Sequence, residues 1–222
     1  MLSVIVADYN NEKYVRECLG SILDQTFKDL EIVVYDDGST DGSLAVIEGF
    51  ARGHSGAIRI IHDPVNRGVA YARHQAILAA SGEYLTTLDS DDFYCNRLKL
   101  EQEMAVIRRF QETHKKEVIS FSNVLLLKNQ APSCLWGNAG TIREGTIGSL
   151  ILCRGCFIPR DFVLKRELYL QAGGYDDRFK IYEDWDLKIR LAMKHEFYYT
   201  GDVGTAYRRH GRGLSALPFT EQ

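Results

Sequence analysis

The sequence predicts an α/β protein with a Rossmann-like, mostly parallel central sheet and helices on both of its faces. Its first half alternates near-continuous apolar segments, typical of strands buried on both faces, with segments whose apolar residues recur at helical spacing. Polar motifs directly follow three of the predicted strands, and open parallel sheets bind ligands beyond the carboxyl ends of their strands. Together these observations predict a nucleotide-type ligand site at that edge of the sheet.

Four strands and three helices are predicted in the first half. Apolar, β-prone runs place the strands, and Ile32, Val33 and Val34 lie in one continuous apolar run. Asp41 offers an N-cap to the second helix, and Ser81-Gly82 ends the third. The strands are expected at residues 2–7, 30–35, 57–61 and 83–88, and the helices at 14–23, 42–51 and 69–80.

The second half is less regular. Helices are expected at residues 97–112 and 183–194, the latter with Leu187 and Leu191 facing inward, and a strand is expected at 118–123. A polar, glycine-bearing stretch at 128–145 indicates a hairpin or a mobile loop, and 162–164 is a short apolar run. We see no internal repeat and no linker, so residues 1–222 are expected to form one domain.

Composition excludes several classes of protein. The chain has 222 residues, 45% of them hydrophobic, with a net charge of -3 and no basic tract, so nucleic acid is not an expected partner. No apolar run reaches the length of a transmembrane helix, and the N-terminus lacks the features of a signal peptide; surface attachment to a membrane stays open. The odd number of cysteines, five, favours a reducing, cytoplasmic location, and Cys153 and Cys156 form a lone CxxC without a second ligand pair.

The most informative motif is Asp89-Ser90-Asp91-Asp92, at the end of the predicted strand at 83–88. Three carboxylates at the mouth of a buried strand repel one another, and a bound cation would relieve this repulsion. Carboxylate oxygens are the ligands that Mg2+ and Mn2+ prefer, and Mg2+ is commonly shared between one or two carboxylates and substrate phosphates. The alternative is a solvated acidic turn before the helix that begins near Asn96.

Two further motifs lie at predicted ligand-binding positions. Asp36-Asp37-Gly38-Ser39-Thr40-Asp41 follows the second strand, where a carboxylate can accept hydrogen bonds from a base or a ribose hydroxyl. A turn with a helix cap would need only Asp41, so the two preceding aspartates exceed that requirement. Asn66-Arg67-Gly68 opens the third helix near Arg73, and helix N-termini and arginines favour phosphate. Taken alone, this second motif is better explained as an ordinary capped helix.

The C-terminal half carries two charged motifs. Glu183-Asp184-Trp185-Asp186 starts a predicted helix, and Asp184 lies on or near the face of Leu187 and Leu191, where a general base facing a cleft would lie. Favourable charge at a helix N-terminus is the alternative. Arg208-Arg209-His210-Gly211-Arg212 offers phosphate-binding arginines and an imidazole metal ligand, or else is a solvated basic segment.

Taken together, the motifs resemble the family-2 glycosyltransferases of the GT-A fold, over nearly the whole length from Ser3 to about His210. A single DxD motif would be weak evidence, whereas this ordered series is specific for the family and much less so for any one sugar. The residues that carry the resemblance are Val4 to Asn10, Ser21 to Thr26, Asp36 to Asp41, Asn66-Arg67-Gly68, Ala72-Arg73, Gly82-Glu83-Tyr84, Asp89 to Asp92, Gly173-Gly174-Tyr175-Asp176 and Glu183-Asp184.

The resemblance implies a role for each motif. Asp37 would hold the uracil or ribose of a nucleotide sugar, Asp89 the ribose, and Asp91 would contact a divalent metal, Mg2+ or Mn2+. Asp184 would be the catalytic base, a role that it suits if modest desolvation raises its pKa, and His210 would join the metal shell. The other residues expected to bind substrate are Ala7, Tyr9, Asn66, Gly68, Arg73, Glu183 and Arg208.

The implied reaction is an inverting, metal-dependent transfer of one sugar from a nucleoside-diphosphate sugar, most simply a UDP-sugar, to a glycan or lipid-linked acceptor in cell-envelope glycan synthesis. The sequence lacks the QxxRW signature of processive synthases, so single additions are expected. The donor half would be about 1–95 and the acceptor half about 96–222. A sugar-nucleotide nucleotidyltransferase is disfavoured, because Asp8-Tyr9-Asn10-Asn11-Glu12 stands where its glycine-rich loop would be. A non-catalytic binding module is the third alternative.

Overall fold

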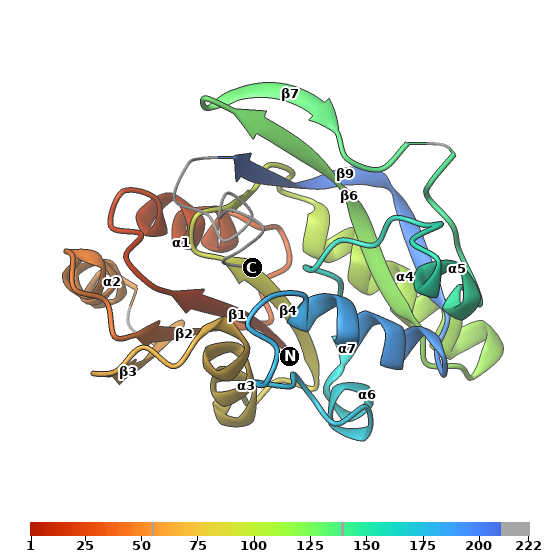
Figure 1. Ribbon diagram of the computed structural model, residues 1–222, viewed down its shortest axis with the longest axis horizontal. Coiled ribbons are helices and arrows are strands. Elements are labelled where there is room, and N and C mark those ends of the chain that lie inside the picture. The colour runs from red at the N-terminus through yellow and green to blue at the C-terminus, as the bar shows by residue number, and fades with distance from the viewer. Residues whose placement is uncertain (55, 139, 210–222) are drawn as a thin grey trace.

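The structure is a computed structural model that describes residues 1–54, 56–138 and 140–209 (Figure 1). All of the helices and strands predicted from the sequence are present, with ends that differ by a few residues. The elements are β1 (Leu2–Asp8), α1 (Val15–Leu23), β2 (Leu30–Asp37), α2 (Ser43–Arg52), β3 (Ile58–Asp63), α3 (Val69–Ala79), β4 (Tyr84–Asp89), β5 (Phe93–Tyr94), α4 (Lys99–His114), β6 (Ile119–Lys128), β7 (Ala131–Leu135), α5 (Gly148–Leu152), β8 (Leu164–Lys165), α6 (Arg166–Gln171), α7 (Glu183–Ala192) and β9 (Phe197–Arg209).

The central sheet confirms the predicted fold class. Its strand order is β3-β2-β1-β4-β8, and β1 to β4 are parallel while the short β8 pairs antiparallel with β4. Strands β1 and β4 are buried almost throughout, as their continuous apolar sequences predict. This arrangement sets the carboxyl ends of β1, β2 and β4 side by side.

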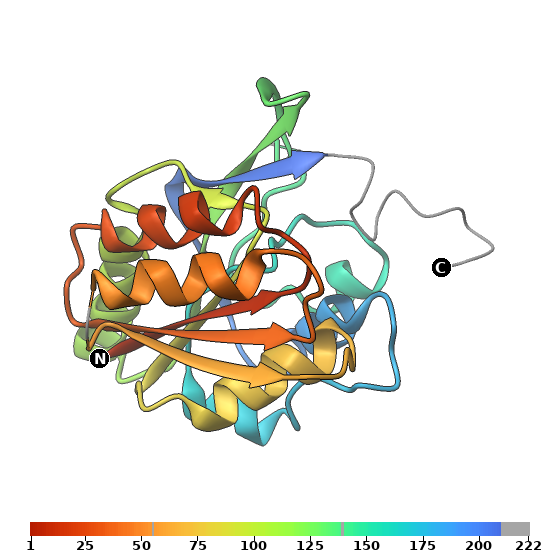
Figure 2. The same ribbon diagram turned by 90° about the vertical axis from the view of Figure 1, so that its left-hand side faces the viewer.

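Helices cover both faces of the central sheet. Residues of α1, α2 and α4, among them Leu19, Ile47 and Met104, share one buried cluster with β1, β2 and β4. Residues of α3, α6 and α7, among them Ala76 and Leu187, share the other. Figure 2 shows α1 and α2 on one side of the strands and α3 on the opposite side. Each cluster takes residues from both halves of the sequence, so the halves share their core.

A second sheet has the order β5-β9-β6-β7, and in Figure 1 its long strands β6 and β9 run from the lower right to the top, where β7 lies. Its long strand β9 was not predicted, because Gly201 and Gly204 interrupt the apolar pattern. A Cβ atom on Gly204 would lie 2.7 Å from Lys99 and Ser122 side-chain atoms, so glycine permits this close packing. Residues 128–135 form a hairpin, one of the two predicted alternatives, with Asn129 and Gln130 at positive φ in its turn. Strand β5 and helices α5 and α6 were also unpredicted.

No helix within the described residues combines the length and the apolar composition needed to cross a lipid bilayer.

A buried ion group joins α4, the loop before β8 and the second sheet. The ammonium of Lys99 lies 2.7 Å from a Glu103 carboxylate oxygen and 3.4 Å from one of Asp161. Asp161 also accepts hydrogen bonds from the hydroxyls of Thr205 and Tyr207 on β9. Burial raises the pKa of Glu103 to about 7 although Lys99 opposes the shift. Because Asp161 directly follows Arg160, this group fixes the backbone beside the predicted site.

Changing Lys99→Met should lower the free energy of unfolding by about 3–5 kcal/mol, since it leaves Glu103 and Asp161 buried without their cation. The second change Glu103→Met in the same chain should restore part of that loss. Urea unfolding at pH 7 measures both, with Lys115→Met, an exposed lysine at the end of the same helix, as the control. A Lys99→Met protein as stable as the control would contradict a structural role for the ion group.

Candidate active site

The predicted polar motifs meet at one edge of the central sheet. The parallel register pairs Asp8 with Asp36 and Ala7 with Asp89, so the segments that follow β1, β2 and β4 are neighbours. Ala7 is half-buried here and Tyr9 is 46% exposed at the rim. The edge therefore offers both a carboxylate-lined floor and an exposed aromatic ring.

Asp37 ties two loops of this edge together. Its carboxylate oxygens accept hydrogen bonds from the backbone N–H groups of Arg67 at 2.9 Å and Gly68 at 2.8 Å. Gly38 has φ +74, and a Cβ atom there would lie 2.7 Å from the backbone nitrogen of Asn66, so glycine allows the loops to touch. Burial raises the pKa of Asp37 even though both hydrogen bonds favour the carboxylate. The loop that carries Asn66 and Gly68 is thus fixed beside Asp37.

Asp8 and Asp36 form a second, deeper acidic pair. The Ser39 hydroxyl donates to Asp8 at 3.2 Å, and Asp36 lies 2.8 Å from the imidazole of His62. One oxygen of each carboxylate is buried without a hydrogen-bond partner. Burial, with the charge of Asp36, raises the pKa of Asp8 to about 6. These groups lie beneath the turn that carries Tyr9 and Asn10, whose backbone N–H bonds to Ser39.

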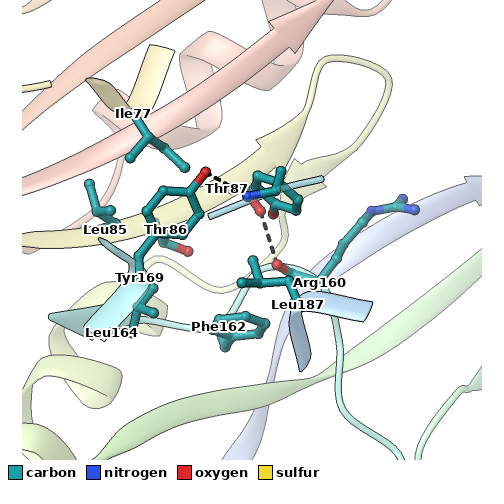
Figure 3. A pocket seen from close by; sticks show the side chains of 10 residues that line it. Ile77, Leu85, Thr86, Thr87, Arg160, Phe162, Leu164, Tyr169 and Leu187 are labelled. Atoms are coloured by element: carbon teal, nitrogen blue, oxygen red, sulfur yellow. Dashed lines mark hydrogen bonds between the residues drawn. The ribbon is translucent and has the colours of Figure 1, made fainter. Parts of the chain in front are cut away.

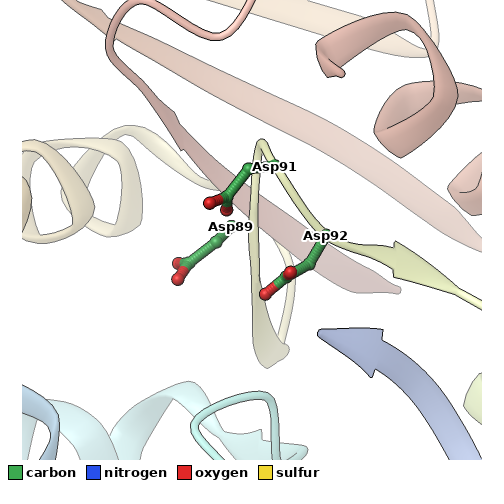
Figure 4. A group of neighbouring side chains, drawn as sticks. All are labelled: Asp89, Asp91 and Asp92. Carbon is green, nitrogen blue, oxygen red and sulfur yellow. The ribbon is translucent and has the colours of Figure 1, made fainter. Parts of the chain in front are cut away.

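Asp89, Asp91 and Asp92 form the acidic cluster that the sequence predicted. One carboxylate oxygen from each lies within 4.8 Å of the others, and Figure 4 shows the three side chains around the turn after β4. Asp89 and Asp91 are half-buried, and Asp92 is fully buried. The spacing Asp89-Ser90-Asp91 fits a DxD motif, and this donor set suits a hard divalent cation.

Two arginines offset the negative charge of the acidic cluster. Arg73 on α3 bridges Asp89 and Glu183, and Arg160 reaches Asp89 at 2.8 Å and Asp92 at 2.6 Å. Burial alone would raise the pKa of Asp89, but Arg160 and Arg73 outweigh it and hold that pKa below its usual range. Burial raises the pKa of Asp92 well above its usual range despite Arg160. Arg73 therefore orients Asp89 from within the protein rather than lying on the surface of the site.

Arg208 links the end of β9 to the acidic turn. Its backbone N–H donates to Asp92 at 2.7 Å, and its guanidinium donates to the Asp91 carbonyl and to the Glu17 carboxylate, each at 2.5 Å. The same guanidinium lies over the rings of Tyr14 and Phe93. Arg208 is therefore a neighbour of the cluster, as expected for a residue near the phosphates. His210, the expected metal ligand, lies outside the described residues.

Glu183 and Asp184 begin α7 at the opposite wall of the site. Tyr182, which precedes them, adopts a left-handed conformation with φ +69, a strained geometry for a tyrosine. Glu183 is buried and accepts from Arg73 at 2.6 Å. Arg73 thereby joins the first turn of α7 to Asp89, and this bridge brings the predicted base region next to the acidic cluster.

Asp184 keeps 27% of its side chain exposed and lies 2.6 Å from the ammonium of Lys188, one turn further along α7. Burial would raise its pKa, but Lys188, with Arg73 and Arg160, lowers the pKa to about 2. The raised pKa that would suit a general base is not found here, because Lys188, Arg73 and Arg160 outweigh the effect of burial. At neutral pH Asp184 is therefore an ionised, partly accessible carboxylate.

The Gly173-Gly174-Tyr175 turn supports Arg73 from behind. Both glycines have positive φ, and a Cβ atom on Gly174 would lie 2.8 Å from the His74 ring, so this turn needs glycine. Tyr175 packs against the guanidinium of Arg73, with 5.7 Å between the ring centre and the guanidinium carbon. The structure thus explains the Gly173-Gly174-Tyr175 motif: its glycines form a tight turn that holds Tyr175 against Arg73.

A small cavity lies behind the site, between β4 and the helices α6 and α7 (Figure 3). Its volume of about 10 Å3 leaves room for about one water molecule, so it is not the ligand site. The carbonyl of Arg160 accepts a hydrogen bond from Thr87 at 2.9 Å, while its guanidinium points away from the cavity. The cavity wall thus anchors Arg160, whose charged end faces the acidic cluster.

Sequence reasoning missed Arg160 and Lys188. Lys188 lies four residues after Asp184, so the helical spacing could have identified it. Three clustered aspartates signal a need for compensating cations, but Arg160 follows Phe157-Ile158-Pro159 without any pattern that singles it out. The acidic cluster and Arg73 are adjacent to Glu183, whereas Asp37, Asn66 and Gly68 line the neighbouring part of the same sheet edge.

Comparison with known proteins finds a match to a family model and relatives that are named glycosyltransferases. The model of "Glycosyl transferase family 2" matches residues 3–115, half of the chain. The chain is 41% identical to the "Glycosyltransferase GlyG" of Streptococcus pneumoniae over 92 residues, which are 41% of this chain and 30% of that protein. The chain thus spans less than two thirds of that relative.

Many solved structures match this chain, among them the following two. "S. aureus TarS 1-349 in complex with UDP-GlcNAc" matches with a TM-score of 0.76 and 23% identity, over 98% of this chain and 61% of that one. The mannosyltransferase PcManGT from Pyrobaculum calidifontis, "in complex with GDP-Man and Mn2+", matches with a TM-score of 0.66 and 21% identity, over 97% of this chain and 59% of that one. Both likenesses show the GT-A fold.

Changing Lys188→Met should raise the pKa of Asp184 measurably above about 2, because the largest charge that lowers it is removed while burial remains. Carbon-13 titration of the aspartate carboxyl groups measures this shift, with Asp184→Asn to assign the signal. Lys194→Met removes a positive charge just beyond the same helix and should leave the pKa near 2. An unchanged pKa in Lys188→Met would contradict the assigned cause.

Proposed function

The chain belongs to glycosyl transferase family 2, and on this premise we propose that it moves a single sugar from a nucleoside-diphosphate sugar to an acceptor hydroxyl, with inversion at the anomeric carbon. The observation that carries the proposal is the bridge of Arg73 between Asp89 and Glu183. It joins a carboxylate cluster suited to a metal diphosphate to the helix that carries an ionised, accessible Asp184. In this proposal the binding groups therefore lie next to the proton acceptor.

The donor nucleotide is proposed to lie along the carboxyl edge of the central sheet. Tyr9 and Ala7 would border the base, Asp37 would accept from the base or ribose, and Asn66 and Gly68 would line the loop that Asp37 fixes. A UDP-sugar is the donor we favour, because the neighbour with a TM-score of 0.76 was solved with UDP-GlcNAc. Asp89 would contact the ribose.

The diphosphate is proposed to lie over Asp91, beside Arg160 and Arg208. A divalent ion, Mg2+ or Mn2+, would be held by Asp91 with His210 as a further ligand, and it would supply charge stabilisation to the departing diphosphate. The choice of ion is supported by PcManGT, which was solved in complex with Mn2+. Arg73 and Arg160 keep Asp89 and Asp92 oriented toward this position.

Asp184 is proposed to accept the proton of the acceptor hydroxyl. The acceptor oxygen forms a bond to the anomeric carbon while the bond from that carbon to the phosphate oxygen breaks, and its electron pair leaves with the nucleoside diphosphate. Attack opposite the leaving group inverts the anomeric carbon. A pKa of about 2 makes Asp184 a weak base, so we propose that acceptor binding displaces Lys188 and raises this pKa.

The setting is also proposed. We infer a cytoplasmic activity, at or near the inner face of the membrane, that adds single sugars to a glycan or lipid-linked acceptor of the cell envelope. The five cysteines are all free thiols, which accords with a reducing compartment. In this proposal the first half of the chain serves the donor and the second half the acceptor.

Changing Asp184→Asn should lower the rate of transfer by about 10^2–10^4 while leaving donor binding largely intact, since the amide cannot take up the proton. A panel of nucleotide sugars, tested by thermal shift with and without Mn2+, first identifies the donor, whose stabilisation should require the metal. Transfer is then measured with that donor.

The matched control is Asp186→Asn, which removes a carboxylate of the same helical turn that pairs with Arg190 instead of facing the cluster. It should retain transfer within a few-fold. Full activity in Asp184→Asn would overturn the assignment of the base. Stabilisation by donors that is equal with and without metal would overturn the metal role.

A further inference from the structure

Trp136, which directly follows β7, is an exposed aromatic residue on a rigid support. The side chain is 43% exposed, yet its ring lies 5.5 Å from that of Phe157 and 5.7 Å from that of Tyr207. Its backbone N–H donates to the carbonyl of Val124 at 2.9 Å. Arg209 lies 5.1 Å from the ring centre. Trp136 is therefore held in place by Phe157, Tyr207 and Arg209, while 43% of its side chain stays exposed.

The support of Trp136 is continuous with the candidate active site. The centre of the Tyr207 ring lies 4.2 Å from the guanidinium carbon of Arg160, which forms salt bridges with Asp89 and Asp92. Tyr207 is itself fixed, because its hydroxyl donates to Asp161 at 2.5 Å and accepts from the backbone N–H of Arg160 at 3.2 Å. Two ring contacts thus separate Trp136 from Arg160, on the side of the second sheet.

Core packing alone does not explain a tryptophan at this position. The cluster beneath it consists of buried Val124, Phe157 and Tyr207, which a smaller apolar side chain could cover. A ring that leaves 43% of its surface in water forgoes much of the stabilisation that burial would give. Isolated exposed aromatic residues are common, but this one packs on Tyr207, which contacts Arg160, the residue that pairs with Asp89 and Asp92.

We propose that Trp136 is a platform for a pyranose ring of the acceptor, which makes the acceptor a glycan. The inference rests on the proposed function and specifies its acceptor. The C–H groups on one face of a pyranose carry partial positive charge, and they pack against the negative face of an aromatic ring. A tryptophan offers the largest such face and loses little conformational entropy on binding.

The binding test uses the two tryptophan indole N–H signals of 15N-labelled protein, because the sequence holds only Trp136 and Trp185. The spectrum of Trp136→Phe assigns the signals. Methyl α- and β-D-pyranosides of glucose, galactose, mannose and N-acetylglucosamine are titrated in the presence of Mg2+ and UDP, with glycerol as an acyclic polyol control. At least one pyranoside should shift the Trp136 signal along a saturating curve, and glycerol should not.

The kinetic test compares transfer to that pyranoside with hydrolysis of the donor by water. The ratio of transfer to hydrolysis should fall about tenfold in Trp136→Ala and about threefold in Trp136→Phe, which keeps a smaller ring. Leu135→Ala is the matched control, because Leu135 is 50% exposed and its side chain points to the opposite face of the strand. It should leave the ratio unchanged.

Three results would overturn the platform: no pyranoside shifts the Trp136 signal, glycerol shifts it equally, or Trp136→Ala keeps the wild-type ratio. Thermal shift with UDP on the same samples tests the donor site separately. A protein that UDP stabilises but whose Trp136 signal never moves refutes the platform and leaves the proposed function standing. A protein whose Trp136 responds to pyranosides but which UDP does not stabilise refutes the donor assignment and supports the platform.

Discussion

Compensation of the carboxylates that follow β4 is the constraint on which this site depends. Asp89, Asp91 and Asp92 lie in one partly buried turn, and the repulsion among them must be offset for the turn to keep its shape. Arg73 and Arg160 supply that charge from a helix and from a loop that are far apart in the sequence. Each arginine also contacts a second element, so neutralising the turn fixes the relative positions of the two sheets and α7.

Pairing with different cations also distinguishes the two adjacent carboxylates Glu183 and Asp184. Glu183 is buried and pairs with Arg73, which makes it part of the support of the site. Asp184 is partly exposed and pairs with the buried ammonium of Lys188. The first turn of α7 therefore carries both a buried anchor and a partly accessible carboxylate, because its neighbouring residues face different partners. The strained Tyr182 precedes both and sets where that turn begins.

Sequence patterns predict the first half of this fold well and the second half poorly, for physical reasons. Strands β1, β2 and β4 are buried on both faces, so their apolar runs and the polar motifs at their ends are local signals. Strand β9 depends on Gly204 fitting against Lys99 and Ser122, a long-range contact at a residue that locally indicates a turn. The role of Arg160 likewise depends on partners that are distant in the sequence, so no local pattern predicts it. The pairing of Lys188 with Asp184, in contrast, could have been predicted from their helical spacing. The pKa of Asp184 could not be predicted without these cations.

The central claim is that the acidic turn, balanced by arginines, holds a divalent ion together with a nucleoside diphosphate. Electron paramagnetic resonance of Mn2+ tests it directly, because the signal of the free ion disappears on binding. We predict that wild-type protein takes up one Mn2+ per chain tightly in the presence of UDP and weakly without it, and that Asp91→Asn abolishes the UDP-dependent binding. Equal Mn2+ binding by wild type and Asp91→Asn, or binding that UDP does not strengthen, would contradict the account.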